Sequence, residues 1–147
     1  MRKKKKIIIV LATILSMFIV YNLLWYAWMN VKYSKYTGDL DEFIPNRSYI
    51  LSQNAYLYNV KLPDYLSLVG NLAVSTDDNK YALIIWPSFI GDNKYGIQIT
   101  DENKQTYSIM INRDLSVIDD VHEEIIDNNK EQVETLFKKA QDMWGEI

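Results

Sequence analysis

The sequence predicts an α+β protein in which an N-terminal transmembrane helix is followed by an antiparallel β-meander packed by a C-terminal amphipathic helix. Three observations predict this fold class: an uncharged apolar run over residues 7–29, period-two alternation over much of residues 49–118, and apolar residues at steps of three and four near the C-terminus. We divide the chain into a basic tail (1–6), a transmembrane signal anchor (7–29), a juxtamembrane linker (30–46) and an extracytoplasmic α+β domain (47–147).

The first element is the apolar run, which contains twenty-three residues without a charge. As a helix it would be roughly 34 Å long, enough to span a hydrocarbon core of about 30 Å. A cleaved signal peptide is the competing interpretation, but its apolar region is usually about 7 to 15 residues long and ends at small residues. Here the run ends in bulky residues such as Trp25, Trp28 and Met29, so we expect an uncleaved anchor.

The flanks of this run predict its orientation. Arg2 and four consecutive lysines precede it, whereas only Lys32 and Lys35 follow closely. Since basic flanks stay on the cytoplasmic side, we expect a single-pass protein of the cell membrane with a cytoplasmic N-terminus and an extracytoplasmic C-terminal domain. Aromatic rings favour the headgroup level. The residues expected at the membrane surfaces are Lys3, Lys4, Lys5, Lys6, Tyr21, Trp25, Tyr26 and Trp28.

Two features inside the run are compatible with homo-oligomers formed through the transmembrane helix. Ala12 and Ser16 form a small-xxx-small step, and Asn22 carries an amide that needs a hydrogen-bond partner in lipid. The alternative is that Asn22 lies close enough to the interface to reach water or headgroups.

The next segment reads as a set of short antiparallel strands. Apolar residues alternate with polar ones over 94–100 and 106–112, which predicts half-exposed strands, and weaker strands are expected at 55–62 and 66–75. Residues 81–86 are apolar throughout and predict a central strand covered on both faces. The connections are short and polar, which favours a meander because parallel strands need long crossovers.

The C-terminal residues change to a helical period. Asn128 and Glu131 have the spacing of a capping box, so we expect the helix to begin near Asn128. Whether residues 119–127 are helical stays open. The apolar stripe of the helix, which needs the buried face of the sheet as its partner, consists of Val133, Leu136, Phe137, Ala140, Met143, Trp144 and Ile147.

Composition excludes several classes of function. The chain has no cysteine, which removes disulfides, thiolate metal sites and a cysteine nucleophile. From residue 31 onward there are eleven basic and nineteen acidic residues, a net charge of −8. An acidic surface repels phosphate backbones, so we do not expect nucleic-acid binding.

Candidate catalytic and metal-binding residues are few. His122 is the only histidine, and the second histidine of an H-E-x-x-H zinc site is replaced by Ile126. The segment from Asp39 resembles the start of a calcium loop, but Ile44 and Ile50 stand at its sixth and twelfth positions, where glycine and an acid are expected. We therefore expect no enzyme activity, no metal and no cofactor.

The most apolar stretch outside the anchor suggests a partner patch at Trp86, Phe89 and Ile90. The alternative is that these side chains cover one end of the core. The functional hypothesis is a membrane-anchored extracytoplasmic module that binds a membrane or envelope protein as an accessory part of a complex, with the lipid bilayer as its other partner. A ligand-binding or sensing domain with a pocket between sheet and helix is the alternative.

Overall fold

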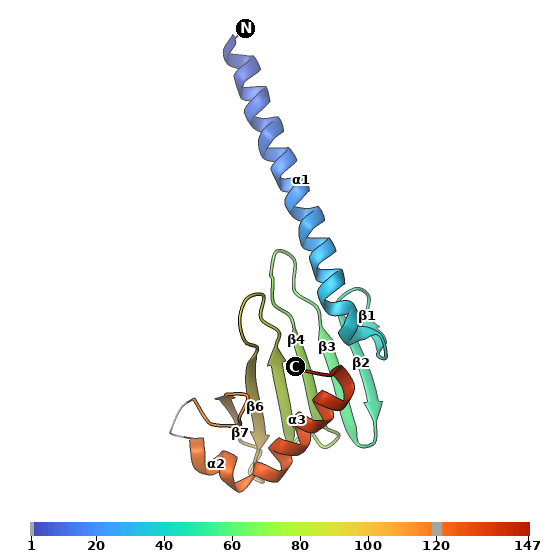
Figure 1. Cartoon of the computed structure of the whole chain (residues 1–147), viewed down its shortest axis with the longest axis vertical. Coiled ribbons are helices and arrows are strands. Elements are labelled where there is room, and N and C mark those ends of the chain that lie inside the picture. The colour runs from blue at the N-terminus through green and yellow to red at the C-terminus, as the bar shows by residue number, and fades with distance from the viewer. Residues whose placement is uncertain (1, 119–121) are drawn as a thin grey trace. The chain divides into compact units, whose positions relative to one another are not determined.

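A computed structural model describes residues 2–118 and 122–147 of the chain (Figure 1). The chain forms two compact units, Met1–Ser34 and Lys35–Ile147. The predicted order of elements is confirmed: a long apolar helix comes first, followed by an antiparallel meander and C-terminal helices that pack on it. The meander has seven strands, two more than the five segments predicted from the sequence.

Helix α1 spans Arg2–Thr37. In the part of the chain that the structure describes, it is the one helix long and apolar enough to cross a membrane, and none of its most apolar window is buried within the protein. A helix that belongs to a soluble core would bury that window, so α1 is compatible with a single-pass membrane anchor. Within the helix, Asn22 Nδ2 donates to the carbonyl oxygen of Phe18 at 2.7 Å, which satisfies one polar group of this amide without a second chain.

Residues 30–46 hold more regular structure than the irregular lead-in that the sequence predicted. Helix α1 continues to Thr37, because no glycine or proline interrupts the chain before Gly38. Strand β1 then covers Asp41–Ile44. Its local pattern is weak, and it becomes a strand because it pairs with β2 (Ser48–Gln53).

The rest of the sheet consists of five further strands, each antiparallel to the one before it. They are β3 (Tyr56–Lys61), β4 (Asn71–Thr76), β5 (Tyr81–Trp86), β6 (Lys94–Thr100) and β7 (Thr106–Ile111). The strand expected over 66–75 begins only at Asn71, because residues 62–70 form a loop that closes on Gly70. A Cβ atom at Gly70 would lie 2.2 Å from the carbonyl oxygen of Lys61, so the two segments approach each other closely.

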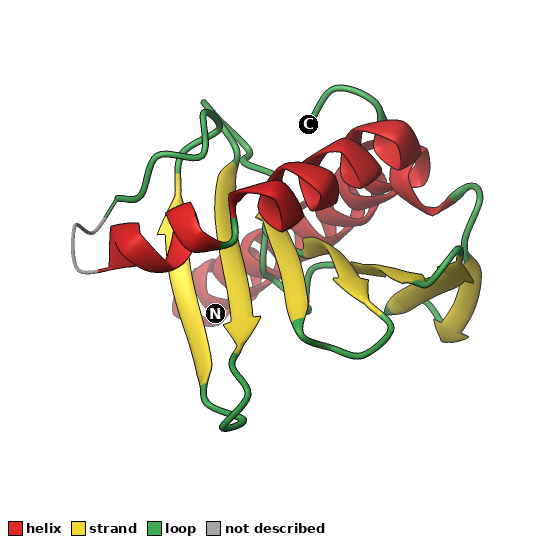
Figure 2. Ribbon diagram, turned by 90° about the horizontal axis from the view of Figure 1, so that it is seen from below, coloured by secondary structure: helices red, strands yellow, loops and turns green. Residues whose placement is uncertain are grey.

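Strand β5 is internal to the sheet, as predicted, but the prediction that both of its faces are covered was wrong. Leu83 and Ile85 are fully buried beneath helix α3 (Lys130–Trp144), which lies on one face of the sheet (Figure 2). Ala82, Ile84 and Trp86 point to the opposite face and are half-exposed. The continuous apolar run of β5 therefore reflects an apolar face that is left uncovered, and not a second layer that packs on the sheet.

The capping box predicted at Asn128 and Glu131 is absent, because the chain is already helical before it. Helix α2 covers Glu123–Asn128, and Asn129 separates it from α3 without a side-chain capping bond. Asn129 instead accepts a hydrogen bond from the Tyr81 hydroxyl at 2.9 Å and donates to the carbonyl oxygen of Ile125 at 2.8 Å. The Asn129 amide therefore joins the break between α2 and α3 to strand β5, which is a tertiary contact and not a local helix cap.

The predicted stripe of α3 forms the helical half of the core. Val133, Leu136, Phe137, Ala140 and Trp144 are buried against the sheet. The Trp144 ring meets that of Tyr58 edge to face at 6.0 Å, and its Nε1 donates to the carbonyl oxygen of Tyr36 at 3.1 Å. This buried hydrogen bond ties the end of α3 to the first residues of its own unit.

The buried Tyr58 makes the stability of the domain depend on pH. Burial raises the pKa of Tyr58 above its usual value, and the charge of Asp142 and the neighbouring Tyr56 act in the same direction. An acid whose pKa is higher in the folded state stabilises the fold while it is neutral, so its contribution is complete below about pH 10 and is lost as the pH rises through the folded pKa.

We therefore expect the free energy of unfolding to fall above about pH 10, and to fall less steeply in Tyr58→Phe, which keeps the ring and removes the ionisable hydroxyl. Urea unfolding of the full chain in detergent, followed by circular dichroism between neutral and alkaline pH, measures this. Tyr65→Phe is the control, because that ring is 60% exposed. If the free energy of unfolding fell equally steeply above about pH 10 in the parent and in Tyr58→Phe, a raised pKa of Tyr58 in the folded state would be contradicted.

Candidate functional site

The candidate metal and catalytic residues do not converge. Within residues 2–118 and 122–147, no group of three or more histidine or acidic side chains could hold a metal ion. His122 is the residue before α2 and makes no capping bond with its side chain, and the preceding acids, Asp119 and Asp120, lie outside the described residues. The segment that resembled a calcium loop is not a loop, because Asp41 and Glu42 lie in β1.

Two turns of the meander carry neighbouring acids, Asp77 with Asp78 and Asp101 with Glu102, and one acid of each pair accepts hydrogen bonds within its turn. Asp78 Oδ1 accepts from the Thr76 hydroxyl at 2.5 Å and from the Lys80 amide at 2.9 Å. These two bonds hold the pKa of Asp78 below its usual range, and the bond from Thr76 has the larger effect. Asp101 Oδ1 likewise accepts from the amides of Asn103 and Gln105. Such side chains stabilise the turns in which they occur.

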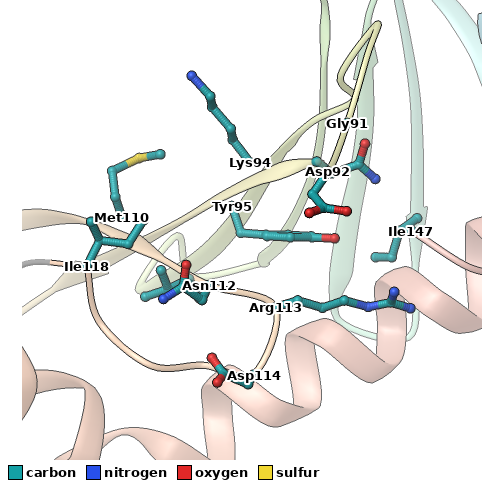
Figure 3. A pocket seen from close by; sticks show the side chains of 12 residues that line it. Gly91, Asp92, Lys94, Tyr95, Met110, Asn112, Arg113, Asp114, Ile118 and Ile147 are labelled. Atoms are coloured by element: carbon teal, nitrogen blue, oxygen red, sulfur yellow. The ribbon is translucent and has the colours of Figure 1, made fainter.

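An open cleft of about 930 Å³ lies at one end of β6 and β7 (Figure 3). Tyr95, Asp92 and Arg113 line it, together with the C-terminal Ile147. Arg113 is paired with Glu146 at 3.3 Å, and Asp114 Oδ1 accepts from the Ser116 hydroxyl at 2.6 Å. Figure 3 shows that Lys94 extends away from Asp92 and Arg113. The cleft is large enough for a small molecule, but its lining is mixed in polarity and its charges are partly paired.

A sensing domain would need a pocket between sheet and helix. An open hollow of about 530 Å³ lies at the margin of this layer, lined by Gln53 and Tyr58 from the strands and by Lys139 and Asp142 from α3, but the centre of the layer is filled with side chains. Val60, Leu72, Leu83 and Ile97 from the strands and Val133 from α3 are all fully buried there. The centre of this layer is therefore a packed core.

The structure divides the predicted partner patch into two parts. Trp86 ends β5 and is half-buried, and its indole lies across Gly96 of the neighbouring strand. A Cβ atom at Gly96 would come within 3.0 Å of two indole ring atoms, so the absence of a side chain there gives the ring its place. Phe89 and Ile90, in contrast, are 53% and 82% exposed in the β5–β6 loop.

Trp86 belongs to the uncovered face of the sheet, which we call the open face. The strand register aligns one row across it, from β2 to β7: Ile50, Asn59, Ala73, Ile84, Gly96 and Met110. Over β3 to β7 this face has two charged side chains, Lys61 and Lys94, and both lie at the end where Trp86 is found. Its remaining polar residues include cross-strand pairs such as Thr100 and Thr106, whose hydroxyl oxygens are 3.0 Å apart.

Both strand edges of the sheet are blunted, which disfavours recognition by addition of a further strand. Strand β1 has four residues, includes two acids and is interrupted by a register shift between Glu42 and Ile44. Beyond β7 the chain folds back, so that Ile111 pairs with Val117 and the Ile118 amide donates to the carbonyl oxygen of Met110 at 3.1 Å. The open face, and not an edge, is therefore the broad surface that the sheet offers to a partner.

The residues predicted at the membrane surfaces all lie in α1. Lys3 to Lys6 are exposed in its first turns, and Tyr21, Trp25 and Trp28 share one side of the helix by their spacing, with Tyr26 on another. Lys32 Nζ lies 5.0 Å from the ring centre of Trp28, a cation–π contact at the C-terminal side of the apolar run.

Comparison with known protein families, with characterised proteins and with solved structures finds no match to this chain.

Proposed function

We propose that the chain is a single-pass membrane protein whose C-terminal domain lies on the extracytoplasmic side and binds another protein of the membrane or envelope without catalysing a reaction. The observation that carries this proposal is the open face of the sheet. Helix α3 covers one face only, and the other is a broad surface whose centre is uncharged and partly apolar.

The side chains of the open face fit the surface of a protein partner better than they fit a highly charged ligand. Trp86 supplies a large ring fixed over Gly96, and Met110, 40% exposed, supplies a flexible thioether beside it. A fixed aromatic side chain with adaptable neighbours is typical of the energetically important centre of protein interfaces. The two lysines at its end favour a partner with an acidic or neutral rim.

The basic residues before the apolar run support the proposed orientation, since they favour a cytoplasmic N-terminus. A permanent anchor beside a binding surface suits an accessory subunit, because it restricts the search for a partner to the plane of the membrane.

Site-specific photo-crosslinking tests the proposal. A photoreactive phenylalanine analogue placed at Met110 of the full chain in native membranes is expected to capture a discrete protein, and the same analogue at Gln132 on α3 is not. Met110→Glu should lower recovery of that protein by about tenfold, since burying an unpaired charge at an interface costs several times RT. Gln132→Glu is the matched control, because it adds the same charge on exposed α3 surface. Equal adducts at both positions would contradict a role for the open face.

A second candidate function is binding of a small molecule, which the cleft beside Tyr95 and Arg113 favours by its size. Native mass spectrometry of the full chain extracted from its own membranes distinguishes the two. A bound small molecule that is lost in an Arg113→Ala variant would favour the cleft over the open face.

A further inference from the structure

Six of the exposed large apolar side chains of the domain lie in two loops at one end of the sheet, and the others, Phe43, Ile44, Met110 and Ile118, lie in β1, in β7 and after β7. In an antiparallel meander the connections that follow β1, β3 and β5 emerge at the same end. The β3–β4 loop (62–70) and the β5–β6 loop (87–93) leave neighbouring strand ends, since Leu72 pairs with Ile85 (Figure 1). We call these two loops the apolar end. Their exposed apolar residues are Tyr65, Leu66, Leu68, Val69, Phe89 and Ile90, each at least 40% exposed.

The opposite end of the sheet has a different composition. Its turns, at 54–55, 77–80 and 101–105, carry acids, lysines and amides. Among the described residues of these turns, none is a large exposed apolar side chain. The apolar character is therefore specific to one end of the sheet.

The loops of the apolar end are held in shape with these side chains outward. In the first loop, Leu62, Pro63 and Gly70 are buried at the base, and the Ser67 amide donates to the carbonyl oxygen of Asp64 at 2.8 Å. In the second, the Ser88 hydroxyl donates to the carbonyl oxygen of Ile90 at 2.6 Å, and its amide donates to Asn93 Oδ1 at 3.0 Å. The apolar tips are a built feature of the fold, and exposing them to water carries a free-energy cost.

Charge around the apolar end also differs from that of the acidic domain as a whole. Three exposed basic residues border it: Arg47 in the β1–β2 turn, Lys61 at the end of β3 and Lys94 at the start of β6. The two loops hold two acids, the exposed Asp92 and Asp64, which is paired with Lys61 at 3.2 Å, so the three basic residues leave a small positive excess at this end. Apolar and aromatic tips with a basic border are the combination that inserts into a headgroup layer and meets anionic lipids.

The covalent connection to α1 keeps the domain near the surface of a bilayer that α1 spans. Residues 30–37 continue α1 beyond the predicted span and add roughly 12 Å of helix, after which the first strand begins at Asp41. The headgroup region on each side of the hydrocarbon core is several Å thick, so the domain starts close to the lipid surface.

We propose that the apolar end is a second membrane contact, in which the tips of the two loops insert into the headgroup layer of the bilayer that α1 spans. This inference rests on the membrane anchoring in the proposed function. The contact would fix the orientation of the domain on the membrane and leave its open face to a protein partner.

Depth measurement with spin labels tests this contact in the full chain, and the absence of cysteine gives a clean background for single labels. Nitroxides are attached at Ile90→Cys and Leu68→Cys, with Glu102→Cys at the opposite end as the matched control. The protein is reconstituted in vesicles of phosphatidylcholine and phosphatidylglycerol. We expect labels at 90 and 68 to collide several-fold more with oxygen, and less with a water-soluble nickel chelate, than the label at 102.

Labels at 90 and 68 that behave like the label at 102 would overturn the proposal. Shielding of these labels from both reagents would indicate a protein contact and overturn it as well. A label at Leu15→Cys reports on the anchor separately: a lipid-like signal at 15 with aqueous signals at 90 and 68 removes the second contact only, whereas an aqueous signal at 15 removes the anchor. If the difference between the labels at 90 and 68 and the label at 102 disappeared in vesicles without phosphatidylglycerol, binding of the anionic lipid would be assigned to the basic border, and this result would support the proposal.

Discussion

Arginine at both Ile14 and Phe18 is expected to release most of the chain from the membrane fraction. Each arginine near the centre of a transmembrane helix costs about 2.5 to 3.5 kcal/mol of insertion free energy, so the pair costs roughly 5 to 7 kcal/mol. Both side chains are more than half exposed in α1, so no packing within the protein compensates for the change. Carbonate extraction of membranes from cells that express each variant, followed by immunoblotting, measures the retained fraction.

The matched control is Ile14→Leu with Phe18→Leu, which preserves hydrophobicity and should leave extraction unchanged. Release of this control, or full retention of the arginine pair, would contradict the assignment of residues 7–29 as an anchor. The same membranes report orientation, since protease added to intact cells is expected to digest the C-terminal domain and leave the tail of lysines protected.

Leu83→Ala is expected to destabilise the domain by about 2 to 5 kcal/mol, the usual cost of removing a buried leucine side chain and leaving a cavity. Leu83 is 0% exposed in the middle of β5, beneath α3. Because domains are stable by only about 5 to 15 kcal/mol, this single change removes a large fraction of the total. Urea unfolding of the full chain in detergent, followed by circular dichroism, gives the difference.

Leu68→Ala is the control for the same chemical change at an exposed position. Leu68 is 40% exposed in the β3–β4 loop, and we expect its truncation to change stability by less than about 1 kcal/mol. Similar losses for the two variants would mean that the apolar end is part of the folding core, which would contradict both the packing and the proposed membrane contact.

The sequence predicted the fold class because each element has its own period. The alternation around Ile97 and Ile109 matches β6 and β7, and the stripe through Val133 and Ala140 matches the buried side of α3. The meander followed from the short turns, which leave no room for crossovers. The capping box at Asn128 misled because the same spacing occurs where a helix merely breaks, and the pairing of Tyr81 with Asn129 is invisible to local pattern.

The candidate surfaces were less accessible to sequence reasoning. The stretch with Trp86, Phe89 and Ile90 was predicted as one patch, but β5 ends inside it, so its members belong to two surfaces. The apolar end went unrecognised, although Tyr65, Leu66 and Leu68 stand within a loop where polar residues are usual. Their concentration between Pro63 and Gly70 was the signal that could have revealed it.

By itself, the sequence determined the apolar helix, the order of strands and the apolar side of the last helix, because these depend on local hydrophobicity and period. Only the tertiary structure decided which face of β5 is left uncovered, which loops share an end of the sheet, and that Gly96 makes room for Trp86. Those features depend on strand register and on the single helical layer, which join residues far apart in the chain and leave no local periodic trace.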